Sequence, residues 1–474
     1  MAETDSRARS DTETFVSWRE ILTSAYLPSL VLVCLAVWLH AADGLIVATM
    51  LPSIVAQIGG GELVGWSVSV YEIGSIVAGA ASALLTVRFG LRTPMTMAAI
   101  LFGCGCVISA VSANMPTVLF GRALQGLGGG ALVAMSYVAV GVFFPRRYIA
   151  RAMAAVSTFW GASAFLGPLI GGFFVEFATW RWGFAFFGLQ AFALAVWIGL
   201  KGGNSDVQAE RSLPGLPIGR LLLLCLSVLL IAYGGVDVAL GTTTIFVSCG
   251  IFCMIAFLLL DGRAGPTRLM PLSPFDIRYP TGAALVMILC ISIAAIAITA
   301  FGPILVVAIH GASALTAGYI VACSSIGWTV TALAVSGAPE RHDRSLIALG
   351  IIVVALSVVG FVYAVPNGPI WLIALFAAME GGGFGIAWTF ILRRATALAD
   401  ANEIERIAGA IPTIHRLGYA LGAAYIGIVA NAMGFLSMDT PAEAAQVAHW
   451  VFVACLPFAI LSLIAMFALV KRGG

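Results

Sequence analysis

Long apolar stretches separated by short polar ones recur along the whole chain. Fourteen of them are long enough to form membrane-spanning helices, because a bilayer core about 30 Å thick needs about 20 apolar residues. They are too long for the strands of a β-barrel, and they do not alternate between apolar and polar residues. The pattern therefore predicts an all-α polytopic membrane protein. The expected spans are 27–52, 63–86, 93–112, 116–143, 149–175, 181–200, 218–239, 242–260, 281–308, 314–336, 345–365, 369–394, 404–432 and 448–470.

Two longer polar stretches divide these spans into groups of six, two and six. Neither stretch is long enough to form a domain. This layout predicts two six-helix bundles with an inserted helix pair between them. The expected parts are an N-terminal tail (1–26), a first bundle (27–200), a linker (201–217), the inserted pair (218–260), a second linker (261–280) and a second bundle (281–474).

The distribution of Lys and Arg predicts the orientation. With the N-terminus inside, the inner segments hold 21 of the 24 basic residues. The outer loops hold Arg181, and Arg122 and Arg416 lie within spans. Because basic residues concentrate on the cytoplasmic side of membrane proteins, we expect both termini and both linkers in the cytoplasm, in a bacterial inner membrane.

Composition and motifs exclude several classes of protein. The chain is 61% hydrophobic and 10% charged, whereas soluble domains carry about 25% charged residues. The nine cysteines show no metal-binding spacing, and no catalytic motif or nucleotide-binding loop is present. We therefore expect no enzyme activity, no metal, no cofactor and no nucleic-acid partner, and we expect a monomer.

Ionisable side chains inside the apolar stretches are the candidate functional residues. Such a residue at the bilayer centre costs about 2.5–3.5 kcal/mol, so it usually faces a cavity or a partner. They divide equally between the two predicted bundles, as expected for a pathway that runs between them. The candidates for proton coupling or substrate binding are Asp43, Glu72, Arg122, Glu380, His415 and Arg416.

Asp43 and Arg122 lie at depths that allow contact. A carboxylate paired with an arginine stays ionised, and loss of the pair favours protonation, so the pair is either a proton switch or a static ion pair. Glu380 precedes Gly381, Gly382 and Gly383, which could let the helix bend or let a substrate reach the backbone. It is a candidate for carrying a proton or for binding a polar or cationic group.

The adjacent His415 and Arg416 point about 100° apart on a helix, so they cannot line the same face of a pore. His415 is either a coupling residue or a hydrogen-bonded core residue. Aromatic side chains at similar depths could line a pocket for flat organic molecules, or simply face lipid. The candidate pocket residues are Tyr71, Gln125, Trp160, Trp388 and Tyr419.

Short motifs occur in a fixed order along the chain. They are an acidic stretch from Ala42 to Pro52, an RxxQGxG motif from Arg122 to Gly128, a GPxxGG motif from Gly167 to Gly172, and Gly311-Ala312-Ser313 with Ala317-Gly318. With these motifs the chain resembles the major facilitator superfamily, and within it the fourteen-helix drug:proton antiporters. The resemblance covers the whole chain and implies alternating access between two bundles.

Two groups of residues resemble the gating elements of that family. The loop after the second span retains Arg88, Gly90 and Arg92, but Val87 stands where the family pattern GxLxDRxGR has an aspartate. The GPxxGG motif contributes Gly167, Pro168, Gly171 and Gly172, whose spacing also suits close helix packing.

Three functions are compatible with the sequence. The first is a proton-coupled secondary transporter that exports amphipathic or aromatic compounds. The second is a proton-driven importer of one organic solute or vitamin such as riboflavin, which the altered gate loop permits. The third is a membrane receptor or a lipid-handling scaffold, although no sensory domain accompanies the helices.

Overall fold

The structure is a computed structural model of the whole chain, and it describes residues 18–23, 25–201, 217–336, 338–400 and 403–471. Residues 202–216 of the linker expected at 201–217 and most of the tail expected at 1–26 lie outside the described residues. The α-helices are α2 (Trp18–Ile21), α3 (Leu27–Ile58), α4 (Val64–Phe89), α5 (Arg92–Ala110), α6 (Met115–Phe143), α7 (Arg146–Phe177), α8 (Trp180–Lys201), α9 (Ile218–Tyr233), α10 (Leu240–Gly262), α11 (Pro280–Ala300), α12 (Gly302–His310), α13 (Ala314–Val335), α14 (Asp343–Asn367), α15 (Ile370–Ala397), α16 (Ile404–Ala432), α17 (Pro441–Val453) and α18 (Leu456–Lys471). Short 3₁₀ turns lie at Gly61–Leu63, Gly265–Thr267, Glu340–His342 and Phe435–Ser437.

Several helices begin and end where local chemistry requires it. Asn114 caps α6 and Ser313 caps α13, each accepting a hydrogen bond from a backbone N–H of the first turn. Thr440 and Glu443 form a reciprocal capping box at the start of α17. The chain leaves α3 through Gly59, whose φ of 71° suits a residue without a side chain.

Twelve helical segments in the described part of the chain are long and apolar enough to cross a membrane. The sequence predicted fourteen spans. The two that are not among the twelve are α9, which has 16 residues, and α16, which has 29 residues but carries several charged side chains. The span expected at 281–308 is interrupted between α11 and α12, where Gly302-Pro303 follows Phe301.

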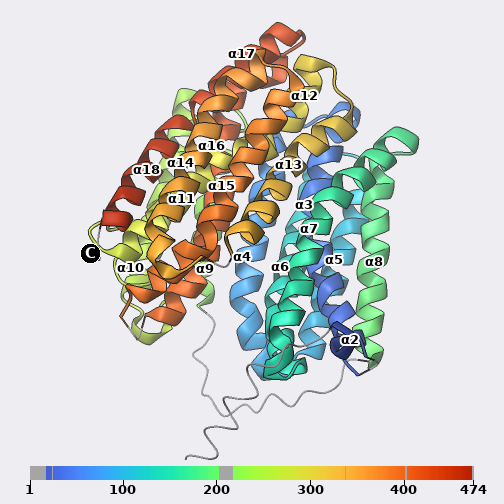
Figure 1. Cartoon of the computed structure of the whole chain (residues 1–474). Coiled ribbons are helices and arrows are strands. Elements are labelled where there is room, and N and C mark those ends of the chain that lie inside the picture. Colours follow the sequence, from blue (N-terminus) through green and yellow to red (C-terminus); the bar gives the residue numbers. More distant parts are fainter. Residues whose placement is uncertain (1–17, 24, 202–216, 337, 401–402, 472–474) are drawn as a thin grey trace, which may run out of the picture.

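The helices form two groups, and α10 lies on the side of the second group that faces away from the first (Figure 1). In what we call the first half, α3 packs on α7, α4 on α6, and α5 on α6 and α8. In the second half, α11 to α18, α15 packs on α13 and α14, and α11 on α16 and α18. The pair α9 and α10 packs mainly on itself and touches both α16 and α4 through α9. Whether these groups are separate domains with the expected boundaries stays a prediction.

The two halves meet through α7 with α13, α4 with α16, and α3 with α13. At one end of the molecule, which we call the closed end, Asn431 donates a hydrogen bond to the carbonyl of Glu62 at 3.1 Å. There a side chain at Gly65 would overlap the carbonyl oxygen of Ala423. The closed end therefore brings the start of α4 against the final third of α16.

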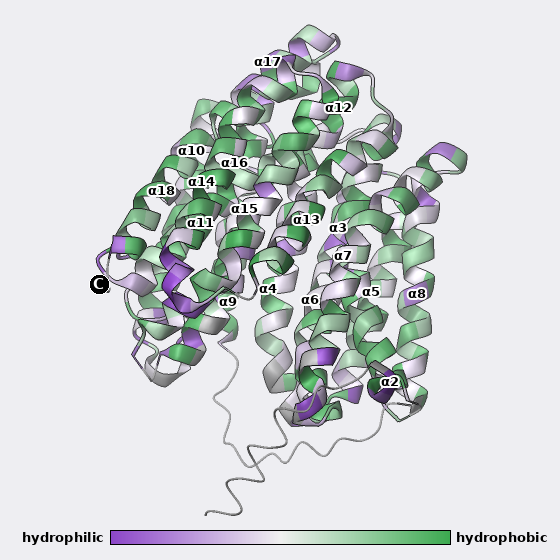
Figure 2. Ribbon diagram, in the orientation of Figure 1, coloured by the Kyte–Doolittle hydropathy of each residue, from purple (hydrophilic) through white to green (hydrophobic). Residues whose placement is uncertain are grey.

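Hydrophobic residues make up most of the length of the helices, and hydrophilic residues gather near the helix ends (Figure 2). Leu200 is 78% exposed and Phe252 is 71% exposed. A soluble protein would not expose so large and continuous an apolar surface. A lipid bilayer would cover it.

Candidate functional site

Asp43 and Arg122 form an ion pair between α3 and α6, as their depths in the sequence suggested. Both side chains are 3% exposed. The Arg122 guanidinium also donates to Gln125 Oε1 at 2.6 Å, and Gln125 Nε2 donates to Ser109 Oγ at 3.2 Å. The pair is thus buried within the first half and held by a polar side chain of the same helix.

Tyr71 connects this pair to a histidine. The guanidinium carbon of Arg122 lies 4.2 Å from the centre of the Tyr71 ring, a cation–π contact. The Tyr71 hydroxyl lies 2.8 Å from His40 Nδ1. Gly129 of α6 leaves room for this arrangement, because a side chain there would lie 2.9 Å from the same nitrogen.

Arg416 of α16 reaches from the second half into the first. Its guanidinium donates to Glu72 Oε2 at 3.1 Å and to His40 Nε2 at 3.0 Å. The edge of Trp160 faces the His40 ring with 6.0 Å between centroids. We refer to the continuous set Asp43, Arg122, Tyr71, His40, Arg416 and Glu72 as the inter-half network.

His40 is absent from the residues that the sequence singled out. It lies three positions before Asp43, so the two share a face of α3. It is also an ionisable side chain in the middle of an apolar stretch. These two features together could have identified it.

Glu380 lies on α15 and is 3% exposed. Ser324 of α13 packs against the next residue, Gly381, and Oε1 of Glu380 has no hydrogen-bond partner among the described residues. The carboxyl group therefore keeps a vacant acceptor inside the second half.

The glycines after Glu380 serve close packing. The helix α15 continues unbroken through them. A side chain at Gly381 would overlap the backbone of Ser324 in α13, and one at Gly383 would overlap the backbone of Gly350 in α14. In this conformation the neighbouring backbones fill the space beside these glycines, and a bend of the helix at this run stays a prediction.

His415 sits among aromatic side chains of the second half and accepts or donates a hydrogen bond with Ser292 Oγ at 2.8 Å. Arg416 points the other way, toward the first half, as their adjacency required. The sequence named Trp388 and Tyr419 but missed Trp328 and Phe384. The aromatic cluster, with ring-centre distances from His415, consists of Tyr419 (4.4 Å), Trp388 (5.1 Å), Phe384 (5.7 Å) and Trp328 (6.4 Å).

The residues expected at the gate loop, after α4, make their contacts within the first half. Arg92 donates a hydrogen bond to the carbonyl of Gly199 at the end of α8. Gly90 ends α4 with a φ of 72°, and Arg88 is exposed with its guanidinium 5.4 Å from the Phe89 ring centre. The loop thus joins α4, α5 and α8.

The GPxxGG motif lies where α7 meets two neighbours. Gly167 and Gly171 face α3, where added side chains would come within 3.0 Å of Leu45 and 3.1 Å of Thr49. Gly172 faces Leu315 of α13 in the second half. Pro168 lies inside α7, which remains helical around it. The motif therefore supplies both the packing within the first half and part of the contact between halves.

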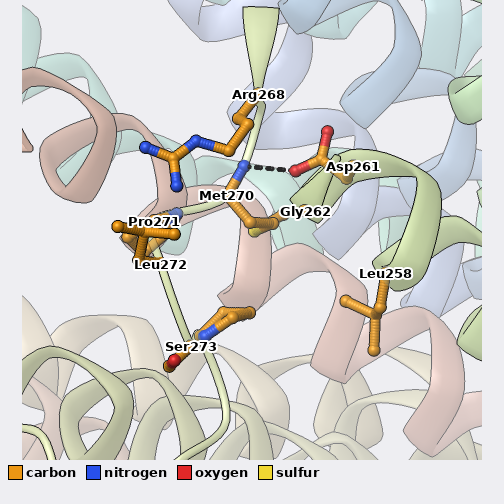
Figure 3. A pocket seen from close by; sticks show the side chains of 9 residues that line it. Leu258, Asp261, Gly262, Arg268, Met270, Pro271, Leu272 and Ser273 are labelled. Atoms are coloured by element: carbon orange, nitrogen blue, oxygen red, sulfur yellow. Dashed lines mark hydrogen bonds between the residues drawn. The ribbon is translucent and has the colours of Figure 1, made fainter. Parts of the chain in front are cut away.

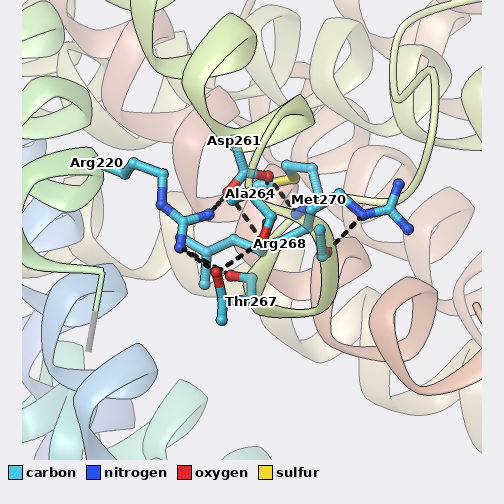
Figure 4. Close-up of polar contacts among 8 residues, drawn as sticks. Arg220, Asp261, Ala264, Thr267, Arg268 and Met270 are labelled. Carbon is cyan, nitrogen blue, oxygen red and sulfur yellow. Dashed lines mark hydrogen bonds and ion pairs between the residues drawn. The ribbon is translucent and has the colours of Figure 1, made fainter. Parts of the chain in front are cut away.

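A second polar cluster lies at the end of α10 (Figure 4). The Asp261 carboxylate pairs with Arg220 of α9 and accepts backbone N–H bonds from Leu269 at 3.0 Å and Met270 at 2.9 Å. Arg268 extends from the same segment to Glu403, at 2.7 Å. We call this the linker cluster. It turns the expected linker 261–280 into an ordered segment attached to the start of α16.

A small pocket lies beside the linker cluster, and the side chain of Arg268 lines it (Figure 3). No group of three or more His, Cys, Asp or Glu that could hold a metal ion occurs in the described ranges. The chemistry that the molecule offers therefore lies in buried charges and aromatic rings.

Known proteins share both the sequence pattern and the fold. The pattern that defines the Major Facilitator Superfamily matches residues 33–259. A "Probable multidrug-efflux transporter" of Mycobacterium tuberculosis is 29% identical over 428 residues, covering 88% of this chain and 90% of that protein. The multidrug transporter protein MdtP of Bacillus subtilis is 26% identical over 308 residues, covering 63% of this chain and 56% of that protein.

Among solved structures, a bacterial homolog of the human lysosomal transporter Spinster superposes with a TM-score of 0.64 at 13% identity. The superposition covers 94% of this chain and 97% of that one. At this identity the likeness concerns the fold. Together with the ordered motifs and the membrane-spanning helices, these matches show that the chain is an integral membrane transporter of the Major Facilitator Superfamily and resembles its drug:proton antiporters.

Proposed function

We propose that the protein is a proton-coupled antiporter that exports amphipathic or aromatic organic compounds by alternating access. The observation that carries the proposal is the inter-half network, in which a buried carboxylate–arginine pair is connected through Tyr71 and His40 to Arg416 of the other half. The similarity of this chain to the mycobacterial efflux protein extends over 428 residues and supports the proposed class of substrate.

In this proposal Asp43 is the proton-binding residue of the first half. A proton on the carboxylate removes the charge that holds Arg122. Arg122 lies on the Tyr71 ring, and Tyr71 forms a hydrogen bond with His40. Movement of the Arg122 guanidinium therefore shifts Tyr71 and His40, and with them the hydrogen bond between His40 and Arg416. Proton binding and the contact between halves are thereby coupled.

The second half supplies the substrate site. The vacant acceptor of Glu380 suits a polar or cationic group, and the aromatic cluster around His415 suits a flat apolar body. Glu380 and Trp388 lie on α15, which contacts α16, the helix of Tyr419. A ligand with both features would use both.

We further propose that α9 and α16 also cross the bilayer, which gives fourteen spans. The helix α16 packs against α11 and α4, both of which are apolar spans. Its charged residues Arg416 and His415 face these neighbours and their side chains, so lipid need not solvate them. We place both termini in the cytoplasm of a bacterial cell, with the protein acting as a monomer.

Transport direction is the decisive test. Membrane vesicles of both orientations would be loaded with a proton gradient and offered a panel of fluorescent aromatic compounds that includes riboflavin. An exporter accumulates its substrate in inverted vesicles with an acidic interior. Accumulation only in right-side-out vesicles with an acidic exterior would show a proton-driven importer and overturn the proposal.

A further inference from the structure

His40 contacts both halves through its two ring nitrogens. Nδ1 lies 2.8 Å from the Tyr71 hydroxyl in α4, and Nε2 lies 3.0 Å from an Arg416 nitrogen in α16. The residue is 6% exposed. Every hydrogen-bonding position of the ring is therefore used.

The partners fix the protonation of the ring. An arginine has N–H donors and no acceptor, so Nε2 must present its lone pair to Arg416. The proton of the neutral ring is then on Nδ1 and is donated to the Tyr71 oxygen. The Tyr71 hydroxyl in turn can donate to the His40 carbonyl at 3.3 Å. The contact with Arg416 thus requires a neutral His40.

We propose that His40 is the residue through which a proton weakens the contact between the two halves. A second proton, on Nε2, places an N–H against the guanidinium N–H groups of Arg416 with no acceptor between them, and two cations then adjoin. Arg416 retains Glu72 as its other partner, at 3.1 Å. The hydrogen bond from Arg416 to His40 is then lost, and the two positively charged side chains repel each other.

Other charged groups surround the ring and bear on its protonation. Glu72 and Asp43 favour a charged His40, whereas Arg122 and Arg416 oppose it, and α7 contributes the uncharged Trp160. They come from α4 (Glu72), α3 (Asp43), α6 (Arg122) and α16 (Arg416). Burial of the ring also opposes the charged form, so the proposed additional proton requires water to reach the ring.

This assignment deepens the proposed function, on which it rests, and its test does not need transport. Spin labels would be placed at Ala56 and Asp439, exposed positions at the closed end in different halves, in a variant without native cysteines. Distances would be measured in lipid nanodiscs at about pH 8 and about pH 5, which bracket the ordinary titration of histidine. We expect a longer distance to become populated at the lower pH.

Variants separate His40 from its neighbours. His40→Gln keeps an acceptor for Arg416 but cannot become charged, so it should keep the short distance at both pH values. Arg416→Gln removes the cation that a protonated His40 would repel, so the distance should not respond to pH. Glu72→Gln leaves the His40–Arg416 contact and should still respond, as should the exposed control His449→Gln.

A wild-type distance that does not change with pH would overturn the assignment, and so would a His40→Gln protein that responds as the wild type does. If His40→Gln does not fold, a wild-type pH response in Arg416→Gln would overturn it equally. A His40-dependent response in a protein that moves no protons with substrate would refute the proposed function and leave this assignment standing.

Discussion

The inter-half network and the linker cluster are both built from buried carboxylates and arginines, but they differ in what the carboxylates hold. Asp261 accepts two backbone N–H groups of its own segment in addition to Arg220. Glu403 likewise accepts the N–H of Leu272 and pairs with Arg268. These carboxylates fix the path of the chain.

In the inter-half network the contacts join side chains from different helices. Asp43 holds Arg122, Arg416 holds Glu72, and His40 lies between Tyr71 and Arg416. A small displacement of one helix breaks such contacts without unfolding any segment. In the proposed mechanism, carboxylates that accept backbone N–H groups fix the structure, whereas carboxylates paired only with side chains of other helices supply the charges that switch.

The largest effect should follow from breaking the buried pair of the network. Asp43→Asn and Arg122→Gln should each lower the transport rate by at least about tenfold, equivalent to about 1.4 kcal/mol, because each removes a charge on which the coupling depends. Membrane insertion should be normal. Asp439→Asn, at an exposed loop position, is the matched control.

The double variant tests whether the two residues act together. Coupled residues give a combined loss smaller than the sum of the two single losses, measured as transport free energies in a double-mutant cycle. Strictly additive losses would mean that Asp43 and Arg122 act independently.

Glu380 should give a narrower defect than Asp43. Glu380→Gln keeps the shape and hydrogen bonding of a protonated carboxyl group but cannot titrate. If Glu380 carries a proton, proteoliposomes with this variant should exchange substrate at equal concentrations and fail to accumulate it. If Glu380 holds the substrate, affinity should fall, most for cationic compounds. Uphill transport with wild-type rate and affinity would make the residue structural.

A charge of the linker cluster should affect stability more than transport. Asp261→Asn leaves Arg220 and backbone N–H groups without a charged acceptor, at a cost of about 1–3 kcal/mol. We expect a lower Tm in detergent and near-normal transport by the folded protein. Asp276→Asn is the control, since Asp276 accepts the N–H of Arg278 in an exposed turn. An unchanged Tm together with lost transport would show that Asp261 serves transport and not stability, and would contradict the structural role given to the linker cluster.

The smallest effect on transport should come from single cysteine substitutions that test the topology. In a background without reactive cysteines, Ser273→Cys near the linker cluster and Asp439→Cys at the closed end are both exposed. A membrane-impermeant thiol reagent added to intact cells should modify position 439 and not position 273. Labelling of position 273 from outside would reverse the proposed topology.

The helical fold and much of the site follow from local properties of the sequence. Apolar length predicted fourteen spans, of which twelve correspond to described helical segments long and apolar enough to cross a membrane. The cost of burying charge singled out Asp43, Arg122 and Arg416, which form ion pairs in the structure. Partner choice across the two halves does not follow in the same way. The pairing of Arg416 with Glu72 joins residues 344 positions apart, and only the packing of α4 on α16 brings them together.

Other features needed three-dimensional packing as well. The glycines after Glu380 suggested a bend or access to the backbone, and the sequence did not indicate that α13 and α14 approach closely at these positions. Trp328 joins the aromatic cluster from α13, a contact that no sequence spacing indicates. The polar linker 261–280 gave no sign of order, because its order depends on Asp261 meeting backbone groups eight and nine residues later.

Proton movement driven by a substrate gradient tests the central claim most directly. Purified protein would be reconstituted in proteoliposomes that contain a pH-sensitive dye, with no imposed proton gradient, and a transported substrate would be added outside. The account predicts that protons move opposite to the substrate, and that Asp43→Asn abolishes this movement. Substrate uptake without proton movement, or protons moving in the same direction as the substrate, would contradict it.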